Sequence, residues 1–424
     1  MSGLAIGASG IVGVAIEVLP APVQAALATA ATGGTIADGT YRYVVTAINA
    51  VGETVASNEQ TIVTAGGGLS TVTVSWAAVT GATGYKLYKT AAGGATGTEL
   101  LYKTVGLVVS DIDTAPGSPA GAFPTANTAY DPGTYRAPTK FIPILNETLH
   151  QIEDTVFRRP IRESASVIGA VAGNEHSEGD ISMEALEDCL LYFILAARAT
   201  TVKTGSAPNY VYTVTPNASA VPTRTLSVTI VRSGEVFAYT GVTVGSFKFG
   251  IDNGLLTFAI TVVARQEATQ TAPVTTWPTT APFGAGMYSI EIPTGTAVTD
   301  TDTFEWTCED NAEPQFRLKS TGRGADFVKY GERDVTCTAM RDFTSKTDYD
   351  LFKAVTSQSF TLTATKGVNN LITILTPVTV KETYEVGLSG QGDLVRASIA
   401  YRGMIDGTGK DYQLVIKTQE SVAV

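Results

Sequence analysis

The chain has 424 residues, enough for two or three domains that each bury a hydrophobic core. Only 16% of the residues are charged, and the abundance of glycine, threonine and valine is typical of many short strands joined by tight turns. The formal net charge of −11 argues against a protein that grips nucleic acid, since phosphate binding requires a basic face.

The first 28 residues are largely apolar, as in a secretion signal. They contain no Lys or Arg, however, glycines interrupt them, and Glu17 lies within the apolar run, so the pattern disfavours a signal peptide. No uninterrupted apolar stretch is long enough for a membrane-spanning helix. The three cysteines are odd in number and far apart, which predicts neither a disulfide framework nor a zinc site and fits a reducing compartment.

Residues 21–127 have the pattern of a small β domain. Two of its predicted strand regions, 39–59 and 70–91, carry aromatic residues at positions suited to a core. These aromatic residues are Tyr41, Tyr43, Trp76, Tyr85 and Tyr88. Both regions resemble a fibronectin type III domain, but their order along the chain is reversed. The resemblance therefore implies a circularly permuted sandwich of two sheets.

Two amphipathic helices are predicted beyond residue 128. The first covers residues 182–198, with Ser182 as its N-cap and an apolar stripe at helical spacing. The second covers residues 345–357, where Ser345 and Asp348 form a predicted capping box.

Residues 240–265 and 376–402 look like two copies of one hairpin. Both begin near Val-Thr-Val, turn through a glycine-rich patch and close on an apolar strand that ends in Arg. The matched positions are Gly250 with Gly387 and Arg265 with Arg402. With the helices, the hairpins predict two units of strand, helix and four-strand meander, over residues 155–272 and 286–418.

Local signals mark the turns and connections of these units. Ser233-Gly234 and Asp252-Asn253-Gly254 predict hairpin turns, because such residues accept positive φ at little cost. The first unit contains an extra stretch, residues 201–223, which we expect to lengthen a loop. The Pro/Thr-rich stretch 268–286 is a predicted linker.

Several stretches beyond residue 128 resemble the tail tube protein of long-tailed bacteriophages. They are the entry stretch 137–150, the Arg-rich stretch 157–164 and the closing stretch 392–418. The resemblance covers residues 128–424. It implies a mainly β fold of two tandem tail-tube β-barrel or sandwich units, each with one flanking helix, plus a small Ig/fibronectin-like β-sandwich insert.

The resemblance also implies a division of the chain into domains. They are an N-terminal arm of the tube domain (1–20), the fibronectin-like decoration (21–127), the first tube barrel (128–272), a linker (273–285) and the second tube barrel (286–424). Tube subunits of this family form rings of six barrels whose inner sheets join edge to edge. A chain with two barrels therefore implies homotrimeric, pseudo-hexameric rings, whereas duplication of the hairpin alone implies a homohexamer.

The implied function is that of a structural virion protein. Stacked rings form the hollow tail tube for genome delivery into a bacterial host, and genomic DNA passes through without specific binding. The implied partners, besides other copies, are tail proteins such as the tape measure, terminator and distal tail proteins. The implied location is the phage tail, assembled in the bacterial host cytoplasm, and a flexible and a contractile tail are both compatible with the sequence.

Two groups of charged residues are candidate contact sites. The suggested ring-stacking contacts pair arginines with an acidic loop at 174–180, although a solvated strand and loop would give the same pattern. They are Arg158, Arg159, Arg162, Glu175, Glu178 and Asp180. The candidates for lining the lumen are Glu382, Glu385 and Asp393.

The sequence favours no catalytic, cofactor or metal site. His176 lies among carboxylates, but His150 is the only other histidine, which disfavours a metal centre and a catalytic triad. The alternative function is a fibronectin-bearing surface adhesin or carbohydrate-binding protein. In that case the binding platforms would be Tyr41, Tyr43, Tyr85 and Tyr88, although their strand positions fit core packing better.

Overall fold

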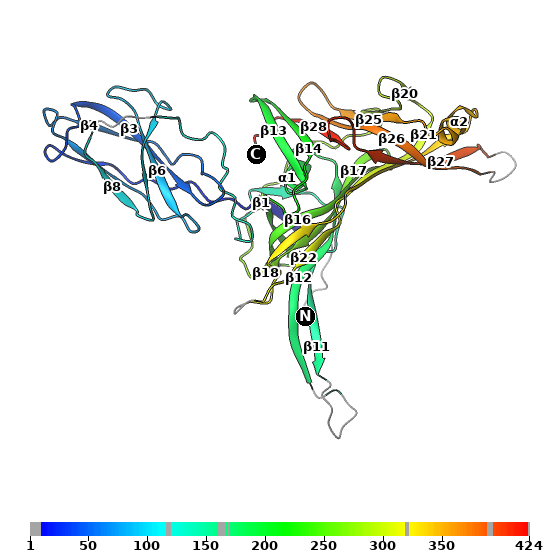
Figure 1. Ribbon diagram of the computed structural model, residues 1–424, viewed down its shortest axis with the longest axis horizontal. Coiled ribbons are helices and arrows are strands. Elements are labelled where there is room, and N and C mark those ends of the chain that lie inside the picture. The colour runs from blue at the N-terminus through cyan, green and yellow to red at the C-terminus, as the bar shows by residue number, and fades with distance from the viewer. Residues whose placement is uncertain are drawn as a thin grey trace. The chain divides into compact units, whose positions relative to one another are not determined.

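The computed structural model describes residues 10–115, 120–158, 167, 169–318, 322–387 and 393–422. These residues form 28 strands and two short helices, so the fold is mainly β, as predicted (Figure 1). The chain divides into two compact units. The small unit is Val18–Asp131, and the large unit comprises the chain up to Glu17 together with Pro132–Val422.

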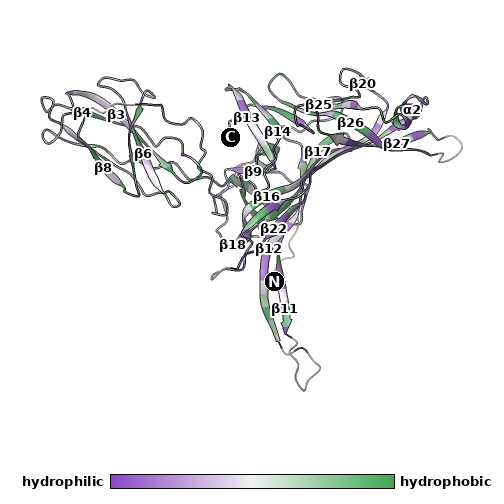
Figure 2. Cartoon of the chain, viewed as in Figure 1, coloured by the Kyte–Doolittle hydropathy of each residue, from purple (hydrophilic) through white to green (hydrophobic). Residues whose placement is uncertain are grey.

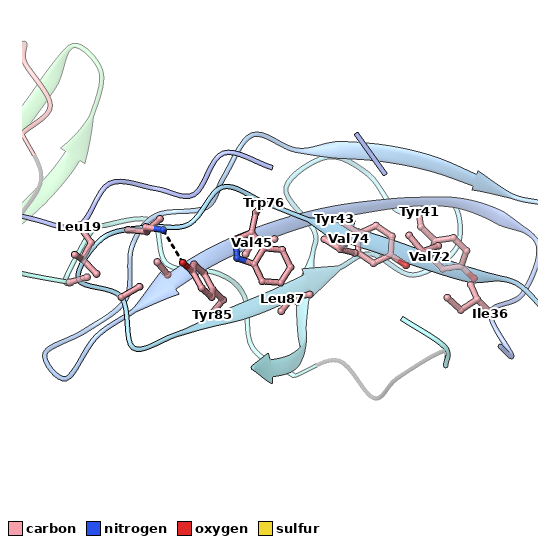
Figure 3. Close-up of a cluster of buried hydrophobic side chains, with 14 residues drawn as sticks. Leu19, Ile36, Tyr41, Tyr43, Val45, Val72, Val74, Trp76, Tyr85 and Leu87 are labelled. Carbon is pink, nitrogen blue, oxygen red and sulfur yellow. Dashed lines mark hydrogen bonds between the residues drawn. The ribbon is translucent and has the colours of Figure 1, made fainter. Parts of the chain in front are cut away.

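The small unit contains two antiparallel sheets. One has the order β2-β5-β8 (Ala28–Ala30, Thr71–Ser75, Ser110–Asp113), and the other has the order β4-β3-β6-β7 (Gln60–Thr64, Gly39–Ile48, Gly84–Lys89, Leu100–Val105). Side chains from both sheets meet in one core that includes Tyr43, Trp76 and Tyr85 (Figure 3). The prediction that these aromatic residues lie in a core is confirmed, because each is 5% exposed or less.

The large unit is built on one antiparallel sheet of eight strands, which we call the long sheet. Its order is β11 (His150–Arg158), β12 (Gly169–Glu184), β17 (Leu255–Ala264), β16 (Glu235–Asp252), β21 (Thr301–Glu309), β24 (Asp334–Asp342), β27 (Arg396–Met404) and β26 (Leu371–Gly387).

Two further sheets flank the long sheet. The first has the order β9 (Lys140–Ile142), β1 (Ile11–Ile16), β15 (Leu226–Arg232), β16 and β18 (Gln266–Ala268). The second has the order β20 (Ala297–Val298), β19 (Tyr288–Glu291), β25 (Gln358–Thr365), β26, β28 (Gln413–Thr418), β14 (Asn209–Pro216) and β13 (Ala199–Ser206).

Strands β16 and β26 each belong to two sheets. A register shift lies between Val244 and Ser246 in β16 and between Lys381 and Thr383 in β26. Such bulges bend a strand, so its two ends can pair with different neighbours. Among the described strands the pairings form an open, branched network, which makes the large unit a sandwich rather than a closed barrel. The remaining short strands are β10 (Asn146–Glu147), β22 (Ala312–Gln315) and β23 (Phe327–Tyr330).

The large unit repeats one order of pairings in its first half (β1 and β9 to β18) and its second half (β19 to β28). In the first half, β12 pairs with β17, β17 with β16, and β16 with both β15 and β18. In the second half, β24 pairs with β27, β27 with β26, and β26 with both β25 and β28. Strands β1 and β19 occupy matching places beside β15 and β25.

The registers refine the correspondence between the two hairpins. Gly250 faces Thr257 and Gly387 faces Arg396, so the two glycines match as predicted. The match of Arg265 with Arg402 is wrong. The second connection is two residues longer (9 positions from Gly387 to Arg396, against 7 from Gly250 to Thr257), so Val263 is the position equivalent to Arg402.

Both helices are shorter than the sequence predicts. Helix α1 covers Glu187–Leu195 after Leu186, and Ser182 is not its N-cap because it lies in β12, paired with Ala259. Helix α2 covers Thr347–Lys353, and no capping box forms. The Asp348 carboxylate instead binds Arg341 and Lys381.

Residues 201–223 do not form the predicted long loop. Most of them lie in the hairpin β13–β14, and β14 pairs with β28 from Tyr210 opposite Thr418 to Val214 opposite Leu414. The first half therefore adds two strands to the second half's sheet. The predicted hairpin turns are confirmed, since Ser233, Gly234, Asn253 and Gly254 all have positive φ.

Candidate functional site

The long sheet has one apolar face and one polar face. On the apolar face, Phe247, Phe249 and Trp306 are buried with ring centroids 5.6–6.3 Å apart. Alternate residues point to the opposite side, as the strand period of two requires. We call that side the polar face. Its charged members are Glu178, Asp180, Glu184, Lys248, Asp252, Glu305, Glu309, Asp334, Asp342, Glu385, Arg396 and Arg402.

Cross-strand registers align the polar residues into rows. Asp180 faces Thr261, Thr261 faces Ser246, and Ser246 faces Glu309. The Thr261 hydroxyl donates a 2.7 Å hydrogen bond to Asp180. This row and its neighbours line a shallow hollow of about 440 Å³. Asp180, assigned from sequence to ring stacking, therefore belongs to the polar face.

The cations of the polar face are paired with carboxylates on this face and beside it. Lys248 is 3.0 Å from Glu305. Arg402 is 3.0 Å from Glu382 and 3.3 Å from Asp334, and its hydrogen bond to Glu382 raises the pKa of the guanidinium.

The third cation of the described polar face, Arg396, is also paired. It is 2.8 Å from Asp302 and 3.7 Å from Asp342. Carboxylates outnumber cations on this face, so its net charge is negative.

The three lumen candidates differ in their surroundings. Glu385 lies on the polar face opposite Ser398. Glu382 occupies the bulge of β26 and binds Arg402. Asp393 is exposed in the connection between β26 and β27.

The long sheet ends in two open edges. Beyond its bulge, the segment Thr383–Gly387 of β26 pairs only with β27 among the described residues. Strand β11 likewise pairs only with β12 in the described chain. Open edges present unpaired N–H and C=O groups and are sites at which another chain can add a strand.

The six ring-stacking candidates are not brought together within one chain. Arg158 lies at the end of β11 opposite Gly169, and Arg159 and Arg162 lie outside the described residues. The predicted acidic loop 174–180 is wrong, because these residues belong to β12 and pair with β11 and β17.

Two of the acidic candidates have partners near the base of the β11–β12 hairpin. Glu175 is 2.8 Å from Arg323, which also binds Glu153. Glu178 is 3.6 Å from His176. The sequence does not predict the ion pairs of Arg323, because no local pattern relates this residue to β11 and β12, which lie about 150 residues earlier in the chain.

The outer part of the β11–β12 hairpin exposes apolar side chains that sequence reasoning also missed. Val156 faces Val171 across the hairpin, and Phe157 is 60% exposed. Figure 2 shows hydrophobic segments along this hairpin. Exposed apolar surface of this kind is typical of protein–protein contacts.

A family model for phage tail tube proteins matches residues 108–403, which include the long sheet except for Met404, the last residue of β27. The chain belongs to the phage tail tube protein family. It is thus a structural component of a virion tail, and self-assembly with contacts to other tail proteins follows in general terms. Membership in this structural family favours a non-enzymatic role. A comparison with curated proteins finds no match.

Three further features of the described chain concern metal ions, cysteines and membranes. Its His, Cys, Asp and Glu residues form no group of three or more that is placed to hold a metal ion. The three cysteines are buried and unpaired. Neither helix of the described chain is long and apolar enough to cross a membrane.

Proposed function

We propose that this tail tube protein polymerises into stacked rings of three chains, which form a hollow tube for genome delivery. The observation that carries the proposal is the long sheet, which consists of two four-stranded segments of matching order, β11-β12-β17-β16 and β21-β24-β27-β26. The pairing of β16 with β21 joins them. Each four-stranded segment corresponds to one of the six repeated sheet segments that make up the tube wall, which we call staves. Three chains then supply the six staves that the family resemblance implies, and a ring of six chains is the alternative.

The internal joint supplies a register for the joint between chains. Within the chain, β16 pairs with β21 from Ser246 opposite Glu309 to Gly250 opposite Glu305. The open segment of β26 is equivalent to this part of β16, and β10 and β11 together are equivalent to β21. Transferring the register places Thr383 opposite Ile152, and Glu385 opposite His150, of the next copy.

The polar face is the proposed wall of the lumen. Its net negative charge would repel a polyanion, and its cations are already paired with carboxylates, so DNA could slide without binding. Asp180, Glu309 and Glu385 are the proposed lumen residues. Asp393 lies in the β26–β27 connection, and Glu382 occupies the bulge of β26, where it binds Arg402.

The β11–β12 hairpin is the proposed contact between stacked rings. Its exposed apolar residues Val156, Phe157 and Val171 would be covered by the next ring. Arg158, at the end of β11, would add positive charge to this contact, and Arg159 and Arg162 are proposed stacking residues from the sequence alone. Glu178 is a proposed partner for them, whereas Glu175 already binds Arg323.

The small unit is the proposed fibronectin-like decoration. It interrupts the chain between β1 and β9, where the second half has only the short turn between β19 and β20. An insertion at a turn leaves the strand pairings of the large unit intact. The tape measure, terminator and distal tail proteins are proposed partners, with assembly in the host cytoplasm.

The adhesin alternative loses its main support. The aromatic residues that it would use as binding platforms, Tyr41, Tyr43, Tyr85 and Tyr88, are 0–5% exposed. Buried rings cannot stack on a sugar.

Electron microscopy of the purified full chain, with subunit mass per ring, tests the proposal. Rings or tubes of three chains with six similar staves are expected. Six chains per ring would reject the trimer and retain the tube. A monomer at all concentrations and salt conditions would contradict assembly by the chain alone.

A further inference from the structure

Helices α1 and α2 occupy matching places in the two halves. Each follows the strand that crosses the long sheet, β12 or β24, and precedes β15 or β25. Their positions can be matched through the sheet. Thr257 and Arg396 are equivalent, because they face the matched glycines of the two hairpins. Glu184 faces Thr257 and Asp342 faces Arg396, so Glu184 is equivalent to Asp342. On this register Tyr192 in α1 is equivalent to Asp350 in α2.

The two helices have opposite environments. All nine residues of α1 are buried, whereas no residue of α2 is buried. Because the halves share their pairing order, the difference lies in what covers each helix.

The second half covers α1. The helix packs against β28 of the second half as well as strands of its own half. The Tyr192 hydroxyl donates a 3.3 Å hydrogen bond to Glu420, just beyond the end of β28. Lys140 joins Asp188 of α1 at 2.8 Å and also binds Glu420.

One side of α2 is aromatic: it packs against Tyr384 of β26 and has no further strand over it in the described chain. Tyr349, Phe352 and Tyr384 form a ring cluster, with Tyr384 5.7 Å from Tyr349 and 6.2 Å from Phe352. Tyr349 is 39% exposed. Beneath the cluster, Asp348 binds the buried Lys381 at 2.8 Å and so fixes the helix on β26.

The first half contains a segment that is equivalent to β28 and Glu420, which cover α1. This segment is itself exposed. Ala238 in β16 and Leu375 in β26 are equivalent positions. Ala268 faces the first and Gln413 faces the second, so Ala268 is equivalent to Gln413, the first residue of β28. Residues 269–277 therefore correspond to the rest of β28 and the residues that follow it. Residues 269–277 lie in no strand, and Val274 is 93% exposed. The segment carries no charge, which suits an apolar partner.

We propose that residues 269–277 of one copy cover the aromatic side of α2 in the neighbouring copy, as β28 and Glu420 cover α1 within the chain. Thr275 of one copy then lies beside Asp350 of its neighbour, in the place of Glu420 beside Tyr192. This inference rests on the proposed ring and adds an outer-layer contact to the inner-sheet joint.

Chemical cross-linking in assembled tubes tests the contact. The double variant Thr275→Cys with Asp350→Cys is treated with a short bismaleimide, and the chains are separated by denaturing electrophoresis. Cross-links between chains give dimers and closed trimers, and the native Cys189, Cys308 and Cys337 are buried, which keeps background low. The matched control is His150→Cys with Glu385→Cys, which reports the inner-sheet joint.

The two pairs separate the inference from the proposed function. Dimers and trimers from both pairs in tubes, and neither in unassembled chains, are expected. Cross-links from the control pair alone would overturn the α2 contact and keep the ring. Absence of tubes under all conditions would reject the ring and the inference with it.

Discussion

At the scale of single residues, buried carboxylates organise the fold more than the composition suggests. Glu17 is fully buried at the end of β1 and accepts four hydrogen bonds. The donors are the backbone N–H groups of Gly133 and Gly241 and the hydroxyls of Thr225 and Ser227. Burial still raises the pKa of this carboxyl. In the sequence Glu17 only argues against a signal peptide, because its partners lie more than a hundred positions away.

We predict that Glu17→Ala destabilises the large unit by about 3 kcal/mol, since it leaves four buried donors without an acceptor. Urea unfolding of the full chain measures the change. The control Glu235→Ala removes an exposed carboxylate and should change the free energy of unfolding by less than about 0.5 kcal/mol. Equal losses from both variants would contradict the anchoring role.

A second residue-scale prediction concerns pH. Burial, followed by a hydrogen bond with Glu59, raises the pKa of Glu99 from 4.5 to about 6. The folded chain therefore holds this proton more tightly than the unfolded chain, so stability falls as pH rises from 4.5 through 6. We expect Glu99→Gln to flatten this part of the profile. The difference in unfolding midpoint between wild type and variant, measured across pH 4–7, checks it, and a constant difference would contradict it.

At the scale of elements, the β13–β14 hairpin links the two halves. Tyr212 on β14 is fully buried, and its hydroxyl accepts a 2.6 Å hydrogen bond from the Val422 backbone N–H and donates to the Glu420 carbonyl. We expect Tyr212→Ala to cost about 3 kcal/mol. Tyr210→Ala is the matched control on the same strand, because Tyr210 is half-buried, and its cost should be at most about 1 kcal/mol. Chemical unfolding compares them, and similar costs would refute a packed joint at β14.

The same hairpin shows what sequence alone can predict. The turns at Ser233-Gly234 and Asn253-Gly254 follow from local residues that accept positive φ, so they are predicted correctly. Residues 201–223 are misassigned as a loop because their partner, β28, lies some two hundred residues away. Ser182 has the chemistry of an N-cap, yet its pairing with Ala259 keeps it in β12. Long-range pairing overrides local propensity in both cases.

At the scale of the whole molecule, the candidate site is a surface built from eight strands, so no single motif encodes it. The acidic composition predicts an acidic lumen in general terms. The residues that line it depend on register, because a shift of one position moves every side chain to the other face. Asp180 illustrates this, since the sequence groups it with the stacking residues and its pairing with Thr261 places it on the polar face.

The charge of the polar face leads to a prediction for assembled tubes. Glu309→Lys with Glu385→Lys reverses two carboxylates of this face, and we expect these tubes to retain short double-stranded DNA. Retention should fall steeply between about 50 and 200 mM salt, because binding releases counterions. Filter retention of labelled DNA by purified tubes measures it, with wild-type tubes expected to retain none.

The control for this prediction makes the same change in net charge elsewhere. Glu235→Lys with Glu313→Lys substitutes two exposed carboxylates outside the polar face. If the polar face lines the lumen, the control tubes should not hold DNA along the tube, and any binding should disappear on washing at moderate salt. Equal retention by both variants would mean that overall charge, and not this face, governs DNA passage. The wall of the tube would then have to be assigned to another surface of the chain.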